Sequence, residues 1–246
     1  MNKNLVHGLW VGNNNLTQLE ILTLKSFIDM GAEFNLWVYE ELKNKLPKEV
    51  VLRNANEIIS KEKIFKYPKN MILGFGEGSY AGFSDVFRYK VLYEYGGWWT
   101  DMDVTCLKPL HEVEDEYWFR FHGILSVVGN IIKVPAKSDL MKLSYEKAII
   151  EVNGNQEDWH HGIRILCYYI ENLGLSKFIH KNESNLDRLD KTWNLIKNEC
   201  DIEKTTSDWR FIHWMNSVIE KNTYHEKSIF SHLIKKYNCE EKKVLM

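Results

Sequence analysis

The sequence predicts the α/β fold class, with a Rossmann-like core over residues 1–135 and a mainly helical region over residues 136–246. In the first half, short apolar runs alternate with amphipathic helical patterns, which is typical of parallel strands joined by helices. After residue 135, helical patterns follow one another at about 138–152, 160–173, 185–199 and 223–237. The chain of 246 residues has no repeat or obvious linker, so we expect a single domain.

The chain opens with a predicted strand, helix and strand. Leu5–Val11 is apolar and ends at a glycine followed by three asparagines, which indicates a strand and a loop. Thr17 is a candidate cap for the next helix, with Glu20 at the capping-box position, and Gly31 ends the helix. Asn35–Tyr39 is the second strand, so this pair should be parallel with a right-handed crossover.

Four more strands and one strong helix complete the predicted core. The helix covers about Ser79–Tyr95 and ends at a Gly-Gly pair. The strands are expected at Val50–Arg53, Trp98–Val104, Tyr117–Phe121 and Val127–Val134. The stretch TTSDWRFIHWMNS, residues 205–217, is aromatic, and we expect it to be irregular.

Charge and composition exclude several classes of function. The net charge of −2 gives no electrostatic footprint for nucleic acid. The four cysteines form no CxxC pair, which favours reduced thiols in a cytoplasmic protein. The N-terminus does not have the pattern of a signal peptide, and no run of about 18 apolar residues predicts a membrane span. Lysines near the C-terminus leave room for peripheral contact with the inner face of the cell membrane, although a solvated helix end explains them as well.

The stretch YGGWWTDMD carries two carboxylates. Residues two apart on a strand point to the same side, so Asp101 and Asp103 are expected to share one face while Met102 points into the core. Two carboxylates at a strand end become favourable when a hard divalent cation lies between them and anionic oxygens. Ligands of open α/β sheets bind at the carboxyl ends of strands, where this pair falls. A chance DxD is common, however, and a calcium loop is a further alternative, disfavoured by Cys106 and Pro109 at its sixth and ninth positions.

The preceding helix strengthens the metal hypothesis. Asp85 and Arg88 are spaced i,i+3 on a helix that is apolar on most sides. A surface ion pair is the simpler interpretation of the two residues. A charged pair on a mostly buried helix is costly unless it is used. The Gly-Gly turn can fold this helix back beside the aspartates, which would bring Arg88 near the cation.

The stretch YAGFSDVFRYKVLYEYGGWWTDMDVTCLKPL resembles the DXD-containing glycosyltransferases of the GT-A fold, and most closely the sugar-binding region of glycosyltransferase family 32. Its spacing is also similar to that in the glucosyltransferase domains of clostridial toxins. The opening HGLWVGNNNLTQLEILTLKSFIDMGAEFNLWVYEE resembles the start of the same family, and the C-terminal third resembles it only loosely. The resemblance implies a nucleotide-binding mixed sheet flanked by helices, with a C-terminal part that closes the site.

The resemblance implies a role for each matching residue of the core. Trp10 would stack on the uracil of a UDP-sugar, at the strand end where Gly12 begins the loop, although a core tryptophan is the alternative. Asp85 and Arg88 would hold the hydroxyls of the donor sugar and the diphosphate side, and Trp99 would lie near the ribose and sugar.

The resemblance also implies roles for residues at the metal and for residues in the second half of the chain. Asp101 would reach the ribose and, through water, the metal, and Asp103 would bind Mn²⁺ or Mg²⁺ directly. His213 would ligate the metal or donate to a phosphate, with a buried core histidine as the alternative. The remaining implied contacts are Asn130 near the donor, Trp214, Asn216 and Ser217 over the diphosphate, and His160 and His161 toward an acceptor. The family's serine-tryptophan pair is missing, because Val218 follows Ser217.

The resemblance implies a metal-dependent, retaining enzyme that moves a hexose from a UDP-sugar to a hydroxyl of a glycan or lipid-linked glycan. Retention needs no separate base if the leaving phosphate takes the acceptor proton, whereas an inverting enzyme would need a carboxylate, for which Asp158 is a candidate. The compact chain favours assembly of a bacterial capsule, polysaccharide or lipooligosaccharide. Three alternatives stay open: a toxin-like effector that glycosylates protein, a non-catalytic nucleotide-sugar or metal-binding protein, and a nucleotide-sugar hydrolase.

Overall fold

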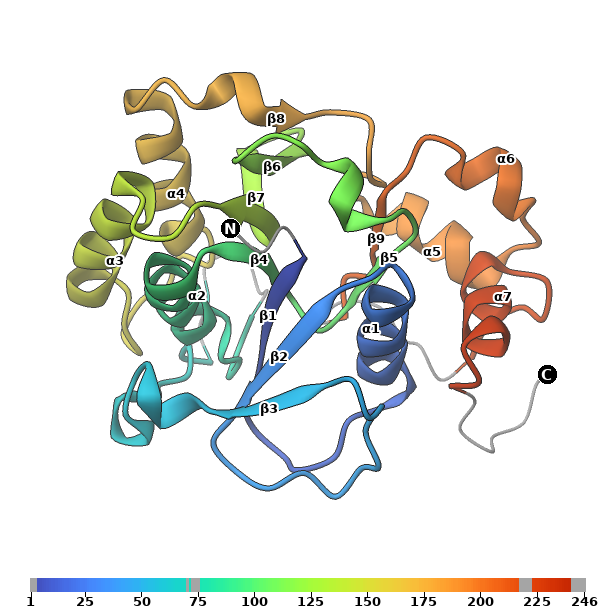
Figure 1. Ribbon diagram of the computed structural model, residues 1–246, viewed down its shortest axis with the longest axis horizontal. Coiled ribbons are helices and arrows are strands. Elements are labelled where there is room, and N and C mark those ends of the chain that lie inside the picture. The colour runs from blue at the N-terminus through green and yellow to red at the C-terminus, as the bar shows by residue number, and fades with distance from the viewer. Residues whose placement is uncertain (1–3, 70, 72–75, 217–222, 240–246) are drawn as a thin grey trace.

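The computed structural model describes residues 4–69, 71, 76–216 and 223–239. A seven-stranded sheet with the order β3-β2-β1-β4-β7-β6-β8 forms its centre (Figure 1). These strands are β1 (Leu5–Trp10), β2 (Glu33–Val38), β3 (Val51–Asn54), β4 (Gly97–Thr100), β6 (Trp118–His122), β7 (Ser126–Val134) and β8 (Ile179–His180). A second sheet pairs β5 (Val104–Cys106) with β9 (Phe211–His213).

The strand directions confirm the predicted α/β class with a mixed sheet. Strands β3, β2, β1 and β4 run parallel to one another, and the opening parallel pair matches the sequence prediction. Strand β7 runs antiparallel to both β4 and β6. The parallel half places the carboxyl ends of β1 and β4 at one edge, where ligands bind in sheets of this kind.

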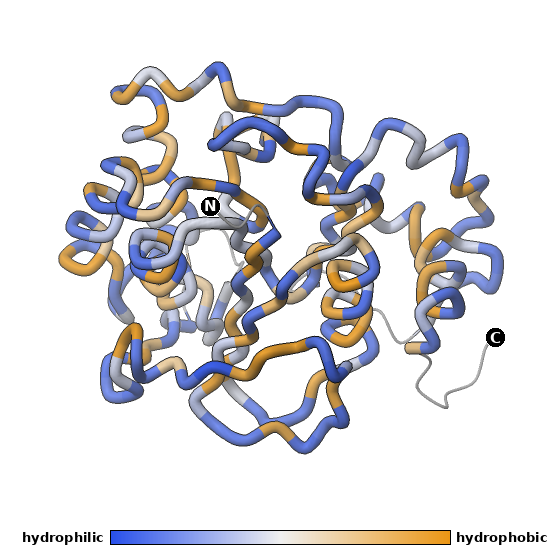
Figure 2. The backbone as a smooth tube through the Cα atoms, viewed as in Figure 1, coloured by the Kyte–Doolittle hydropathy of each residue, from blue (hydrophilic) through white to orange (hydrophobic). Residues whose placement is uncertain are grey.

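Helices cover both faces of the sheet. Helices α2 (Ala81–Tyr95), α3 (Asp139–Glu151) and α4 (His161–Asn172) bury one face, around an apolar cluster that includes Phe87 and Trp99. Helix α1 (Gln18–Asp29) and the β5–β9 pair bury the other. Beyond α1 lie α5 (Leu189–Lys197), α6 (Ile202–Thr206) and α7 (Ile229–Lys236). Hydrophobic and hydrophilic positions alternate along the turns of the helices, as a packed apolar stripe requires (Figure 2).

The start of α1 follows from its local sequence. The Thr17 hydroxyl accepts from the Leu19 amide, and the Glu20 carboxylate accepts from the Thr17 amide at 2.6 Å. This reciprocal capping box satisfies backbone donors that the first turn leaves unpaired. Gly31 then takes a φ of 85°, which a side chain would resist, and the helix ends before it as predicted.

The predicted strand over residues 98–104 is wrong in one important respect, because it breaks in the middle. Strand β4 ends at Thr100, residues 101–103 form a turn, and β5 belongs to the second sheet. The Asp101 amide still donates to the Asn130 carbonyl at 2.8 Å, but the Met102 carbonyl accepts from the Thr23 hydroxyl of α1 at 3.0 Å. The chain therefore crosses from the sheet to α1 at the DxD motif, so strand alternation does not set its geometry. Met102 is buried, as expected.

The C-terminal half is helical as predicted, but its elements are shorter. The pattern at 185–199 gives a helix only at Leu189–Lys197, and the pattern at 223–237 gives one only at Ile229–Lys236. The supposedly irregular 205–217 stretch contributes β9, which pairs with β5 and joins the C-terminal part to the core. None of the helices in the described part of the chain is long and apolar enough to cross a lipid bilayer.

Candidate functional site

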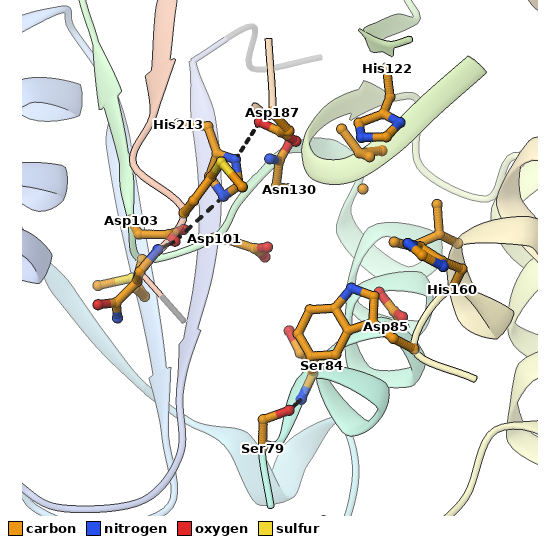
Figure 3. Close-up of a pocket in the computed structure, with 18 of the residues that line it drawn as sticks. Ser79, Ser84, Asp85, Asp101, Asp103, His122, Asn130, His160, Asp187 and His213 are labelled. Carbon is orange, nitrogen blue, oxygen red and sulfur yellow. Dashed lines mark hydrogen bonds and ion pairs between the residues drawn. The ribbon is translucent and has the colours of Figure 1, made fainter. Parts of the chain in front are cut away.

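A cavity of about 820 Å³ opens at the carboxyl ends of β1 and β4. Trp10 at the end of β1 lines it, and so do Asp101 and Asp103, which follow β4. Helix α2 contributes Asp85 and Arg88 to the same wall. Asp101, Asp103 and His213 gather on one side, with Asp85 and His160 on the other (Figure 3). Residues that the sequence predicted from separate motifs therefore face one space.

Arg88 joins α2 to the DxD motif through two carboxylates. Its Nη1 atom lies 2.6 Å from Oδ1 of Asp85, and its Nη2 atom lies 2.8 Å from Oδ1 of Asp101. The same Asp101 oxygen accepts from Trp99 Nε1 at 2.7 Å, and the guanidinium lies 5.2 Å from the centre of the Trp99 ring. Asp85 and Arg88 are buried, at 5% and 3% exposure, so the surface-pair interpretation is wrong.

Two glycines, which lack a Cβ atom, leave room for the Asp85–Arg88 ion pair. A Cβ added to Gly129 of β7 would lie 2.0 Å from Arg88 Nη1. A Cβ added to Gly162 of α4 would lie 2.3 Å from Asp85 Oδ2. Because both distances are far below van der Waals contact, any larger residue at either position must displace the ion pair.

Burial and the neighbouring charges shift the pKa values of Asp85 and Arg88. It raises the pKa of Asp85 to about 6, and the positive charge of Arg88 opposes that rise. Burial lowers the pKa of Arg88, but Asp101 and Asp85 outweigh it, so the guanidinium stays charged. At neutral pH the site therefore holds a fixed cation between two carboxylates, and one of them, Asp101, is 31% exposed at its side chain.

Asp103 is held by the segment that follows β9. The Asn216 amide donates to its Oδ2 atom at 2.8 Å, and the Trp214 amide donates to its carbonyl at 2.9 Å. His213 Nε2 lies 3.4 Å from the same Oδ2 atom. The C-terminal segment thus closes on the second aspartate of the motif, where the sequence placed His213 and Asn216.

A second buried charge network surrounds His213, and no pattern in the sequence predicts it. His213 Nδ1 lies 2.7 Å from Oδ1 of Asp187, and Arg120 bonds both oxygens of Asp187 at 2.7 Å. Burial lowers the pKa of His213, but Asp187 and Asp103 outweigh it and raise the value to about 10. Burial raises the pKa of Asp187, but His213 and Arg120 outweigh it and hold the value far below its usual range. The imidazole is therefore charged between two carboxylates.

Several predicted donor contacts line the cavity, and others lie beside or behind it. Trp10 is partly exposed at the rim, and Asn130 lines the wall with an Oδ1 atom that has no hydrogen-bond partner among the described residues. Gly12, with a φ of 128°, lines a small hollow next to Trp10 instead of the main cavity. Ser217 lies outside the described residues.

Two predicted aromatic contacts need correction. Trp99 is 1% exposed and does not line the cavity. Its indole Nε1 instead donates a hydrogen bond to the Asp101 carboxylate. Trp214 is completely buried among α1, α5 and α7 residues, and its Nε1 atom donates to Thr105 at 2.8 Å. Large aromatic side chains gain most from burial in the core, and both rings take that position.

The polar segment before α4 contributes one of its predicted residues. His160 lines the cavity. His161 pairs with Glu151 of α3 at 3.1 Å and lies outside the cavity lining. Asp158 is paired with Arg164 and does not line the cavity either, which removes the geometric basis for it as a base.

The residues present fit a divalent cation whose coordination a ligand completes. Among the described residues, no three His, Cys, Asp or Glu side chains form a ready-made metal site. A hard cation bound with phosphate oxygens needs only one or two carboxylates, and Asp101 and Asp103 supply them within one cavity. The raised pKa of His213 shows that this position favours positive charge.

Residues 19–120 match the family model of the glycosyltransferase sugar-binding region containing a DXD motif. This stretch of the chain is similar to the sugar-binding region of DXD-containing glycosyltransferases. The matched stretch includes Asp85, Arg88, Asp101 and Asp103, so the resemblance inferred from the sequence is confirmed where those residues lie. DXD glycosyltransferases commonly use a divalent metal, in keeping with the carboxylate pair. No curated protein matches the chain.

Three solved structures are similar to this chain at low identity. The PaToxG glycosyltransferase shares 11% identity with a TM-score of 0.48, over 69% of this chain and 68% of its own. The galactosyltransferase LgtC, in complex with donor and acceptor sugar analogs, shares 8% identity with a TM-score of 0.47, over 98% and 97%. The apo-form glycosyltransferase GlyE of Streptococcus pneumoniae TIGR4 shares 11% identity with a TM-score of 0.46, over 97% and 60%.

Proposed function

We propose that this glycosyltransferase moves a hexose from a UDP-sugar to a hydroxyl of a glycan acceptor, with retention of configuration and with a divalent metal. The observation that carries the proposal is the Arg88 fork, which joins Asp85 to Asp101 in the cavity that also contains Asp103. These residues lie inside the family match. A fixed cation beside two metal-binding carboxylates suits a ligand that carries both a sugar and a diphosphate.

Each end of the donor has a matching part of the cavity. Trp10 offers a partly exposed aromatic face at the rim, on which the uracil stacks. Asp85 and the unpartnered Asn130 oxygen accept hydrogen bonds from sugar hydroxyls. Asp101 reaches the ribose. The cavity of about 820 Å³ falls in the size range of small-molecule and cofactor sites.

The metal belongs at the Asp103 end. Asp103 would hold Mn²⁺ or Mg²⁺ with help from Asp101, and His213 would join as a ligand once the ion displaces its Nε2 proton. The ion would neutralise the leaving diphosphate as a Lewis acid. Arg88 adds a second fixed positive charge that needs no reorganisation during the reaction. The Asn216 amide and the Trp214 amide keep Asp103 in place from the opposite side.

The acceptor approaches from the α4 side of the cavity, where His160 lines the wall. Retention follows in this proposal from proton transfer to the departing phosphate on the same face, so that no carboxylate base is assigned. The acceptor is a glycan or lipid-linked glycan of a bacterial capsule, polysaccharide or lipooligosaccharide. The enzyme would act in the cytoplasm or at the inner face of the cell membrane.

A donor panel tests the proposal. Purified protein is incubated with UDP- and GDP-sugars, with and without Mn²⁺, and nucleotide release is followed. We expect metal-dependent release from one UDP-sugar, lost in Asp103→Ala, and faster release when the acceptor is added. Binding of UDP and Mn²⁺ without sugar release in any acceptor mixture would favour the non-catalytic alternative. Absence of both binding and turnover in the folded protein would overturn the proposal.

A further inference from the structure

Histidine 213 has its two ring nitrogens directed at two different carboxylates. Its Nδ1 atom lies 2.7 Å from Asp187 Oδ1, and its Nε2 atom lies 3.4 Å from Asp103 Oδ2. Figure 3 marks both contacts, with Asp103 on one side of the ring and Asp187 on the other. The short contact fixes the ring, and the longer contact leaves Nε2 facing the cavity. Asp187 therefore decides in which direction the histidine points.

Asp187 is itself fixed by buried groups. Arg120, which is 1% exposed, bonds both of its carboxylate oxygens in a bidentate pair. Such a fork allows little rotation of either partner. Asn185 holds the backbone of the histidine as well, because its side chain accepts from the His213 amide at 2.8 Å and donates to the His213 carbonyl at 2.9 Å. Asp187, which lines the cavity, thus sets the rotation of the imidazole, and Arg120 and Asn185 support it from outside the cavity lining.

We infer that Asp187 is a positioning residue that holds His213 with Nε2 turned toward the Asp103 side of the cavity, where the cation and diphosphate bind. This inference rests on the proposed function, since it assigns a task within the same site. Histidines that ligate metals usually donate their other ring N–H to a carboxylate, which fixes both tautomer and orientation. Arg120 contributes to the same positioning, because its bidentate ion pair keeps Asp187 ionised and limits its rotation.

The same loop carries a matched control. His180 Nδ1 lies 2.8 Å from Glu183 Oε1, and Arg210 Nε lies 2.8 Å from Glu183 Oε2. This second histidine–carboxylate–arginine set lies between β8 and β9, as Asp187 does, but none of its three residues lines the cavity. Glu183→Gln therefore disturbs an equivalent network without touching the site.

The test measures the affinity of the protein for Mn²⁺ in the presence of UDP, by calorimetry or electron paramagnetic resonance. No sugar is present, so direct contacts of Asp187 with a hexose do not contribute. We expect Asp187→Ala to weaken Mn²⁺ binding about 10- to 100-fold. Asp187→Asn, which retains an oxygen for Nδ1–H, should recover most of that loss. Glu183→Gln should bind Mn²⁺ as the wild type does.

A double-mutant cycle separates positioning from direct contact. If Asp187 acts through His213, the His213→Ala/Asp187→Ala variant binds Mn²⁺ no more weakly than His213→Ala alone. Additive losses would overturn the inference. Because Asp187→Ala leaves Arg120 buried and unpaired, Arg120→Met/Asp187→Ala serves as a second variant, with the same expected loss. A wild-type affinity in this variant or in a folded Asp187→Ala would also overturn it.

A metal-free measurement keeps this inference distinct from the proposed function. In the ¹H–¹⁵N NMR spectrum of the apoprotein, the Nδ1–H group of His213 should give the signal of a strongly hydrogen-bonded proton. Asp187→Ala should remove this signal. Failure of the wild type to bind UDP and Mn²⁺ would count against the proposed function. An Nδ1 signal that is unchanged in Asp187→Ala would count against the positioning role alone.

Discussion

Arg88 Nη2 lies 2.8 Å from Oδ1 of Asp101, across 13 residues of sequence and the turn from α2 to β4. This contact fixes the first aspartate of the DxD motif relative to the helix that carries Asp85. The guanidinium also lies against the Trp99 ring, so its plane is defined by three neighbours. In the proposed function, we therefore expect donor recognition to depend on this bidentate guanidinium and not on a single point charge.

Replacing the planar guanidinium of Arg88 with the point charge of a lysine should lower both the stability of the fold and the turnover of the donor. Arg88→Lys cannot bond Asp85 and Asp101 with the same geometry. We expect the free energy of unfolding to fall by about 3 kcal/mol and nucleotide-sugar turnover by about 100-fold or more. Urea unfolding and a turnover assay check the two effects. Glu94→Gln, which breaks ion pairs with Lys90 and Lys137 near the surface, should cost less than about 1 kcal/mol and leave turnover intact.

A single methyl group should displace the same fork without altering the backbone. The Cβ of Gly129→Ala would lie 2.0 Å from Arg88 Nη1, so the guanidinium must leave its present position between Asp85 and Asp101. A misplacement of about 1 Å at such a site costs on the order of 100-fold in rate. Gly123→Ala is the matched control, because its Cβ would meet nothing within 4 Å. Equal turnover in the two alanine variants would show that the position of Arg88 does not matter.

The raised pKa of Asp85 predicts a pH-dependent stability. Burial raises the pKa from 3.8 to about 6, so the folded protein binds this proton more tightly than the unfolded chain. The stabilisation is fully present below about pH 4 and is lost as the pH rises through about 6. Relative to Asp85→Asn, the wild type should therefore lose up to about 1.4 kcal/mol of unfolding free energy per pH unit in this window. Denaturant unfolding at stepped pH measures the difference, and a difference that stays constant would contradict the assignment.

Trp10 supplies the expected surface for the uracil ring. Trp10→Ala should weaken UDP binding by about 1–3 kcal/mol, whereas Trp10→Phe keeps an aromatic face and should lose less. Titration with UDP and Mn²⁺ measures both. Trp193, which is 41% exposed on α5 and outside the cavity lining, provides a control in Trp193→Ala. An unchanged affinity in Trp10→Ala would move the base to another wall of the cavity.

The features that could be predicted from the sequence are those encoded over short distances. The Thr17–Glu20 capping box needs only three residues of separation, and the Asp85–Arg88 pair needs the same. The apolar run before Asp101 placed the motif at a strand end. These signals lie within one element or its flanks, so periodicity and spacing reveal them.

The features that could not be predicted depend on contacts between distant parts of the chain. Arg120 and Asp187 are 67 residues apart, and Asp187 and His213 are 26 apart, so no local pattern links them. Strand β8 has two residues and β9 three, which is too short for an alternating pattern. Trp99 and Trp214 show a further limit, because an aromatic residue beside a motif serves the core or the ligand equally well in sequence terms.

The position of the metal tests the proposed role of Asp101 and Asp103 most directly. A crystal grown with UDP and Mn²⁺ gives an anomalous signal from manganese. We expect a single strong peak in the cavity, next to the Asp103 carboxylate on the side that Asp101 and His213 share, and no such peak in Asp103→Ala. A peak elsewhere, or UDP bound in the cavity with no manganese beside Asp103, would contradict the claim that the DxD aspartates hold a metal beneath the diphosphate.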